Sequence, residues 1–127
     1  MLTLICGLPN AGKTTYSARY DNVIHCDDIP HRTSDEMFEK CHKMLSEIHG
    51  DICVDGVYVS IERRKQLLDA CGHQDKKVCI WIDTPYEECL ERERNYRKRP
   101  LDIVHTHHRM FQPPTLDEGW DEVIIER

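Results

Sequence analysis

One segment near the N-terminus constrains the fold of this chain more than any other. Residues 7–14 read GLPNAGKT, which matches the pattern G-x-x-x-x-G-K-S/T, and they directly follow the apolar run Leu2–Cys6. A continuous apolar run predicts a strand that is buried on both faces, as in a parallel sheet. The glycines let the backbone turn so that successive N–H groups point at phosphate oxygens, and the helix expected over 13–20 adds its positive dipole end. The segment therefore predicts a strand–loop–helix unit that binds a nucleotide.

The residues of this loop have different expected tasks. We expect Lys13 to neutralise the β- and γ-phosphates, and hence to act in catalysis as well as binding, and we expect the Thr14 hydroxyl to be a Mg²⁺ ligand. The other positions would hold the nucleotide around the loop, and they are Gly7, Pro9, Asn10, Ala11, Gly12 and Thr15. The expected cofactors are therefore ATP and Mg²⁺.

The rest of the chain alternates short apolar runs with amphipathic stretches, which indicates an α/β fold. Further strands are expected at 22–26, 52–54, 78–82 and 123–125, and further helices at 33–48, 61–71, 86–97 and 101–111. Thr33 and Glu36 form a capping-box pattern, Ser60 is a plausible N-cap, and Pro100 suits the first position of the last helix. We predict one domain over 1–127, a three-layer α/β/α fold of the P-loop NTPase, kinase type. Its five-stranded sheet is expected to be mostly parallel, with the loop after a central strand.

Seven cysteines are spread along the chain. Their odd number and the absence of a C-x-x-C pattern argue against a disulfide framework or a zinc site, so we expect reduced thiols that serve as small buried hydrophobes. No apolar run approaches the roughly 20 residues needed to span a bilayer. We therefore expect a cytoplasmic protein with no membrane partner, in the host cytoplasm if the gene belongs to a phage.

Several aspartates follow the predicted strands at their carboxyl ends, where ligands bind in open α/β sheets. They are Asp27 and Asp28 after the second strand, Asp55 after the third and Asp83 after the fourth. A kinase needs one carboxylate for the proton of the acceptor hydroxyl and another to order Mg²⁺. We assign the first task to Asp27 and expect Asp55 to support Mg²⁺ or the acceptor, while Asp83 in the sequence D-T-P suits a turn.

A basic segment stands out against the net charge of −6, which itself excludes a broadly basic protein that coats nucleic acid. Residues 91–99 read ERERNYRKR, and the segment is followed by Pro100. It could be a solvated helix face. Its place between a helix and a proline favours a lid, over about 91–100, whose arginines stabilise the transferring phosphoryl group. We expect Arg94 and Arg97 to act in catalysis and Arg99 to contact the nucleotide.

Together these motifs resemble the polynucleotide 5′-hydroxyl kinases of phage and bacterial repair systems. GLPNAGKTT matches the loop of that family, and Asp27-Asp28 matches its D-D pair, in which the first aspartate is the general base. DGVYVSIERR matches an aspartate that precedes an E-R-R sequence, and RNYRKRP matches an arginine lid followed by a proline. The closing PPTLDEGWDEVI is similar to a C-terminal signature of these small kinases.

The chain departs from that family in two places. Pro30 stands where the family has a substrate-binding arginine, three residues after the first aspartate, and Arg32 is the nearest substitute. The stretch between the aspartate pair and the third strand has room for about one helix. Asp28 and Arg32 are therefore the expected substrate-binding residues.

The resemblance implies transfer of the γ-phosphate of ATP to an alcohol group on nucleic acid, DNA or RNA. The acceptor would be a polynucleotide 5′-hydroxyl or a hydroxymethyl group on a DNA base. The acidic body favours an alternative, a small-molecule kinase for a nucleoside, nucleotide or sugar, because tracking along DNA normally needs a long basic groove. A reading from another class is a nucleotide-dependent switch or binding protein, which would leave Asp27 and the arginine segment without a role.

Overall fold

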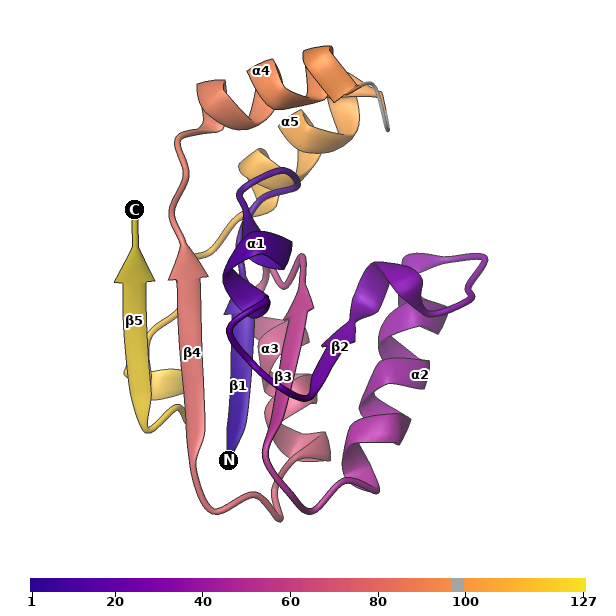
Figure 1. Ribbon diagram of the computed structural model, residues 1–127, viewed down its shortest axis with the longest axis vertical. Coiled ribbons are helices and arrows are strands. Elements are labelled where there is room, and N and C mark those ends of the chain that lie inside the picture. The colour runs from indigo at the N-terminus through magenta and orange to yellow at the C-terminus, as the bar shows by residue number, and fades with distance from the viewer. Residues whose placement is uncertain (97–99) are drawn as a thin grey trace.

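Five strands form one sheet in the computed structural model, which describes residues 1–96 and 100–127. They are β1 (Leu2–Cys6), β2 (Val23–His25), β3 (Ile52–Gly56), β4 (Lys77–Ile82) and β5 (Glu122–Glu126). Their order across the sheet is β2-β3-β1-β4-β5, and every neighbouring pair is parallel (Figure 1). The predicted five-stranded sheet, with its phosphate loop after a central strand, is confirmed.

Helices cover both faces of this sheet. They are α1 (Lys13–Ser17), α2 (Ser34–Ser46), α3 (Ile61–Ala70), α4 (Tyr86–Tyr96) and α5 (Leu101–Met110). In Figure 1, α1 lies in front of the sheet and α3 behind it, while α4 and α5 lie together above the carboxyl ends of the strands. Short 3₁₀ turns at Cys26–Asp28 and Leu116–Glu118 complete the structure. The three-layer α/β/α prediction is therefore confirmed.

Alternating side chains of the buried strands enter two separate apolar clusters. On β1, Leu4 packs into the cluster formed with α2 and α3, whereas its neighbour Ile5 packs into the cluster formed with α4 and α5. On β4, Cys79 and Ile80 divide in the same way. This period of two is the side-chain geometry of a strand, and it explains why the strands read as unbroken apolar runs.

Most predicted caps hold, and several predicted boundaries were wrong by a few residues. Thr33 and Ser60 each accept a backbone N–H bond as N-caps of α2 and α3. Helix α1 ends at Ser17 and not at residue 20, because the chain then closes i→i+3 turns. Helix α2 ends at Ser46, and β2 stops where the 3₁₀ turn begins. Pro100 is the residue before α5 and not its first residue, because its ψ of 143° is extended.

All seven cysteines are buried, as expected for thiols that fill core positions. Among the residues that the structure describes, no helix is long and apolar enough to cross a membrane.

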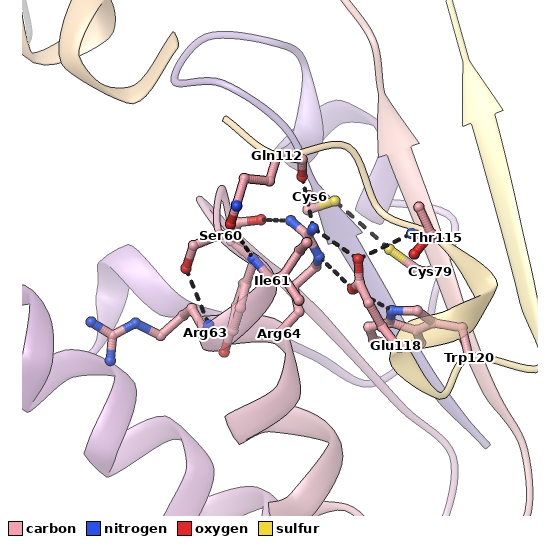
Figure 2. A network of polar contacts seen from close by, with 11 residues as sticks. Cys6, Ser60, Ile61, Arg63, Arg64, Cys79, Gln112, Thr115, Glu118 and Trp120 are labelled. Atoms are coloured by element: carbon pink, nitrogen blue, oxygen red, sulfur yellow. Dashed lines mark hydrogen bonds and ion pairs between the residues drawn. The ribbon is translucent and has the colours of Figure 1, made fainter. Parts of the chain in front are cut away.

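A buried ion pair ties the C-terminal segment to α3 (Figure 2). The side chains of Arg64 and Glu118 are 0% and 2% exposed, with Nε to Oε1 at 2.7 Å and Nη2 to Oε2 at 3.0 Å. The Arg64 guanidinium also donates to the carbonyls of Tyr58 and Gln112, and Trp120 Nε1 donates to Glu118. This arginine is the last residue of the E-R-R sequence, and the glutamate belongs to the closing signature. The ion pair therefore holds the E-R-R sequence and the closing signature together in the fold.

Candidate functional site

The loop between β1 and α1 has the backbone that phosphate binding requires. Asn10 has a φ of 67° and Gly12 a φ of 103°, both in the left-handed region, and Gly12 immediately precedes α1. Gly7 lies against β4 so closely that a Cβ there would stand 2.8 Å from the carbonyl oxygen of Ile82. Glycine is therefore required at Gly7 by close packing and favoured at Gly12 by conformation.

Lys13 and the residues after it line a cavity of about 600 Å³. The Lys13 side chain is buried, and its Nζ donates to the carbonyls of Gly7 at 3.2 Å and Leu8 at 2.7 Å. Thr14 and Thr15 are exposed in the same cavity. The described residues that line it are Asn10, Ala11, Gly12, Lys13, Thr14, Thr15, Tyr16, Arg19, Asp27, Asp55, Arg92 and Tyr96. The cavity thus joins the phosphate loop to two of the predicted aspartates.

Helix α4 holds the outer part of the loop. Arg92 Nη1 donates to the Asn10 carbonyl at 2.6 Å, and Asn10 Nδ2 donates to Glu93 Oε1 at 3.0 Å. Thr84 Oγ1, just before this helix, donates to the Ala11 carbonyl at 2.6 Å. The helix that carries the basic segment is therefore bonded directly to the phosphate loop, so a movement of one would be transmitted to the other.

The two aspartates that line the cavity differ in their surroundings. Asp27 is exposed within its 3₁₀ turn. The Asp55 side chain is 8% exposed, and its Oδ2 accepts from Ser17 Oγ at 2.8 Å and lies 2.7 Å from His25 Nδ1. An exposed carboxylate can meet an incoming hydroxyl, whereas a buried and bonded one is held in a fixed orientation. The two carboxylates thus suit the separate tasks expected of them.

Several other predicted site residues that the structure describes lie outside this lining. Asp28 is exposed in the same 3₁₀ turn as Asp27. Arg32 is exposed, and its backbone N–H donates to Glu36. Arg94 pairs with Glu91 at 3.4 Å on the solvent side of α4. Arg97 and Arg99 lie outside the described residues, so their assigned roles stay predictions.

Sequence reasoning assigned no individual role to six side chains of the site, which are Tyr16, Arg19, Arg92 and Tyr96 in the lining and Ser17 and His25 beside Asp55. Arg92 and Tyr96 line the cavity because they are four residues apart on one face of α4, whereas Arg94 is about 200° around the helix from Arg92. The helical phase relative to the loop could have indicated this. His25 and Ser17 were missed because their contact with Asp55 joins β2, α1 and β3, which no local pattern reveals.

The oxygen ligands in the cavity fit Mg²⁺. The Thr14 hydroxyl and the Asp55 carboxylate both line it, and Mg²⁺ is usually bound by one or two such groups together with substrate phosphates and water. Within residues 1–96 and 100–127, no group of three or more His, Cys, Asp or Glu side chains could hold a metal ion by itself. The site therefore suits a metal that arrives with the nucleotide.

Comparison with known proteins gives a relative in sequence. No protein-family model matches the chain. The chain is 29% identical to the shikimate kinase of Corynebacterium glutamicum, in an alignment that covers 79% of this chain and 68% of that enzyme.

Solved structures of the same fold cover nearly all of the chain. Kti12 of Chaetomium thermophilum, in complex with ADP-AlF3, has a TM-score of 0.73 at 15% identity and covers 98% of this chain and 88% of its own. A gluconokinase of Sinorhizobium meliloti has a TM-score of 0.69 at 14% identity, with 97% and 79% covered. A fungal RNA kinase has a TM-score of 0.65 at 16% identity, with 98% and 74% covered.

The sheet order, the phosphate loop and these likenesses define the chain as a protein with the fold of the P-loop kinases. The relative in sequence and the structural neighbours support a phosphotransferase that uses a nucleotide donor. The names of those proteins point to different acceptors, so the acceptor has to be argued from the residues of the cavity.

Proposed function

We propose that this chain is an ATP- and Mg²⁺-dependent kinase that transfers the γ-phosphate to a hydroxyl on nucleic acid. The leading acceptor is a polynucleotide 5′-hydroxyl, and the other nucleic-acid acceptor is a hydroxymethyl group on a DNA base. The observation that carries the proposal is that Asp27 and Asp55 line the same cavity as Lys13 and Thr14. The residues proposed to hold the donor therefore share one cavity with an exposed carboxylate and with a buried, hydrogen-bonded carboxylate.

The chemistry follows from this arrangement. Asp27 accepts the proton of the acceptor hydroxyl while the oxygen of that hydroxyl forms a bond to the γ-phosphorus. At the same time the bond from the γ-phosphorus to the β–γ bridging oxygen breaks, and ADP is released. Lys13 stabilises the charge on the β- and γ-phosphates. Bound Mg²⁺ would neutralise charge on the same phosphates, with Thr14 and Asp55 as the residues that hold it or its waters.

Arg92 is our candidate for the phosphate clamp on the α4 side. Its guanidinium lines the cavity and bonds to the loop through the Asn10 carbonyl, and its second nitrogen pairs with Glu88 at 2.8 Å. We expect the guanidinium to exchange the carbonyl for a phosphate oxygen when the nucleotide binds. Arg94, Arg97 and Arg99 of the predicted lid remain further candidates for such a clamp.

The rim of the cavity supports a nucleic-acid acceptor. Tyr96 is 70% exposed and lines the cavity, and the Arg19 guanidinium stacks on the Tyr16 ring at 4.0 Å on the α1 side. An exposed tyrosine suits the stacking of a base, and an arginine stacked on a second tyrosine suits contact with a phosphate. Such a rim would contact only the terminal nucleotides of a strand. Because contact with so few phosphates requires no long basic groove, it is compatible with the acidic net charge of the chain.

A small-molecule acceptor is the second candidate. The relative in sequence, at 29% identity, is a shikimate kinase, and the net charge of −6 favours this alternative because tracking along DNA normally needs a long basic groove. Asp28 and Arg32 would then serve such an acceptor at the carboxyl end of β2.

A panel of acceptors with γ-labelled ATP and Mg²⁺ tests these proposals. The panel contains 5′-hydroxyl DNA and RNA, hydroxymethylated duplex, nucleosides, nucleotides, sugars and shikimate. We expect label on the 5′-hydroxyl strands, and the same strands carrying a 5′-phosphate serve as the matched control. Label that enters only small molecules would reject the nucleic-acid acceptor. Slow hydrolysis without transfer to any acceptor would instead favour a nucleotide-dependent switch.

A further inference from the structure

We propose that His25 is a positioning residue of this site, which fixes the Asp55 carboxylate toward Mg²⁺ and links it to the strand that carries Asp27. The inference rests on the proposed function and deepens it. Nothing in the sequence patterns distinguishes this histidine from the other seven of the chain. Its role follows from strand register and from the hydrogen bonds around one carboxylate oxygen.

The register of the sheet brings the two side chains together. His25 is the last residue of β2 and pairs directly with Asp55 of β3. Paired residues of adjacent parallel strands direct their side chains to the same face of the sheet, and the strands are about 4.8 Å apart. His25 Nδ1 accordingly lies 2.7 Å from Asp55 Oδ2, with the imidazole 35% exposed and the carboxylate 8% exposed. The two side chains are therefore in direct hydrogen-bonding contact beside the cavity that Asp55 lines.

Ser17 alone could not hold this carboxylate. Its hydroxyl has one proton, and two acceptors lie within reach: Asp55 Oδ2 at 2.8 Å and the Thr14 carbonyl at 3.0 Å. The His25 ring has no such choice at Nδ1, because Asp55 is the acceptor it contacts there. A donor that is committed to one acceptor orients that acceptor better than a shared donor does. His25 is therefore the residue that sets the rotation of the Asp55 carboxylate.

The orientation leaves the second oxygen of Asp55 for the cavity. Ser17 Oγ and His25 Nδ1 both contact the same oxygen, Oδ2. Because Asp55 lines the cavity, Oδ1 is the oxygen that would face Mg²⁺ or its waters. Partners that orient a metal-binding group typically change metal affinity or activity by about 10–100-fold when they are removed.

The same contact connects the two aspartates of the proposed mechanism. Asp27 follows His25 by two residues, in the 3₁₀ turn at the end of β2. This strand lies at the edge of the sheet and pairs with β3 over three residues. The bond between His25 and Asp55 therefore fixes the end of a short edge strand against its neighbour. Without this bond, the position of the Asp27 carboxylate relative to Asp55 Oδ1 would no longer be fixed.

The test compares His25→Ala with His25→Asn, whose side-chain amide can place a donor near the position of Nδ1. His49→Ala, at an exposed histidine of the loop after α2, is the matched control. For His25→Ala we expect kcat to fall about 10–100-fold and the Mg²⁺ concentration at half-maximal rate to rise about fivefold or more. His25→Asn should return both values to within about threefold of wild type. Wild-type Mg²⁺ dependence and kcat in His25→Ala would overturn the inference.

A binding measurement separates this inference from the proposed function. The affinity of a fluorescent ADP analogue is titrated with Mg²⁺ in the absence of any acceptor, and His25→Ala should need about fivefold more Mg²⁺ for the same gain in affinity. If wild type transfers phosphate to no acceptor, the proposed function fails, and this titration still decides the role of His25. An unchanged titration in His25→Ala would refute that role.

Spectroscopy of the wild-type protein covers the case in which His25→Ala fails to fold. A neutral His25 that donates to Asp55 carries its proton on Nδ1, which a long-range nitrogen–proton NMR spectrum of the imidazole identifies. A proton on Nδ1 supports the inference. A neutral ring with its proton on Nε2 overturns it, because Nδ1 could then donate nothing to Asp55.

Discussion

Removal of the Arg64 side chain is the sharpest test of how the fold is held. We consider Arg64→Met, which keeps most of the aliphatic volume and removes the guanidinium. The variant leaves Glu118, which is 2% exposed, without its cation, and leaves the carbonyls of Tyr58 and Gln112 without a donor. Breaking a buried ion pair at one partner typically costs about 3–5 kcal/mol. A domain has only about 5–15 kcal/mol of stability, so the variant should be close to the limit of folding.

The magnitude converts into two observable shifts. With a slope of about 2 kcal/mol per molar urea, a loss of about 4 kcal/mol lowers the urea midpoint by about 2 M. The same loss lowers Tm by roughly 15 °C for a chain of this size. Lys65→Met, an exposed neighbour on the same helix, should change stability by less than about 0.5 kcal/mol. The double variant Arg64→Met with Glu118→Leu should recover much of the loss, because no unpaired charge remains buried.

The pH dependence gives an independent check on the cause. Desolvation raises the pKa of the Glu118 carboxyl, but the hydrogen bonds from Arg64 and Trp120 and the Arg64 charge outweigh it, so the pKa lies below its ordinary value. A lowered folded-state pKa stabilises the protein above the unfolded-state pKa, and this contribution is lost as the pH falls through the folded-state value. The stability gap between wild type and Arg64→Met should therefore be full at pH 7 and narrow below about pH 4.

Urea unfolding at several pH values, followed by circular dichroism, provides the assay. A loss below about 1 kcal/mol for Arg64→Met, or a double variant no more stable than the single one, would refute the reasoning. A gap that widens on acidification would show that the charge on Glu118 is not what the arginine offsets.

Three further substitutions test the site itself. Gly7→Ala places a Cβ 2.8 Å from a β4 carbonyl and should lower stability by roughly 1–3 kcal/mol and weaken ATP binding, whereas a Cβ in Gly50→Ala meets nothing within 4 Å and should change neither. In steady-state assays Arg92→Ala should reduce kcat/KM for ATP at least about tenfold and more than Arg94→Ala does; the reverse ranking would contradict the clamp. Tyr96→Ala should raise KM about tenfold for an oligonucleotide and leave KM for ATP unchanged, and an equal effect on both would argue against base stacking at the rim.

The fold was predictable because its signals are local. Residues adjacent in the sequence indicate each element, as in the apolar run Leu2–Cys6, the loop Gly7–Thr14 and the N-caps Thr33 and Ser60. Boundaries failed where neighbours gave no sign. Helix α1 ends at Ser17 through i→i+3 turns whose residues look helical in sequence.

The site was predictable only in part, because several of its side chains are placed by contacts between residues that are far apart in the sequence. The phosphate loop and the strand-end aspartates have fixed positions relative to their own strands. Arg92 lines the cavity because of the phase of α4 against the loop, and His25 meets Asp55 because of the β2–β3 register. The Arg64–Glu118 pair spans 54 residues, so the E-R-R sequence and the closing signature could be noticed but not joined.

Asp27→Asn tests the central claim most directly, with transfer from γ-labelled ATP to a 5′-hydroxyl oligonucleotide and ATP affinity measured on the same protein. A general base contributes about 10²–10⁴-fold, so transfer should fall by at least about 100-fold while the Kd for ATP changes by less than about threefold. Retained transfer, or an equal loss of transfer and ATP binding, would contradict the assignment of Asp27 and with it the proposed mechanism.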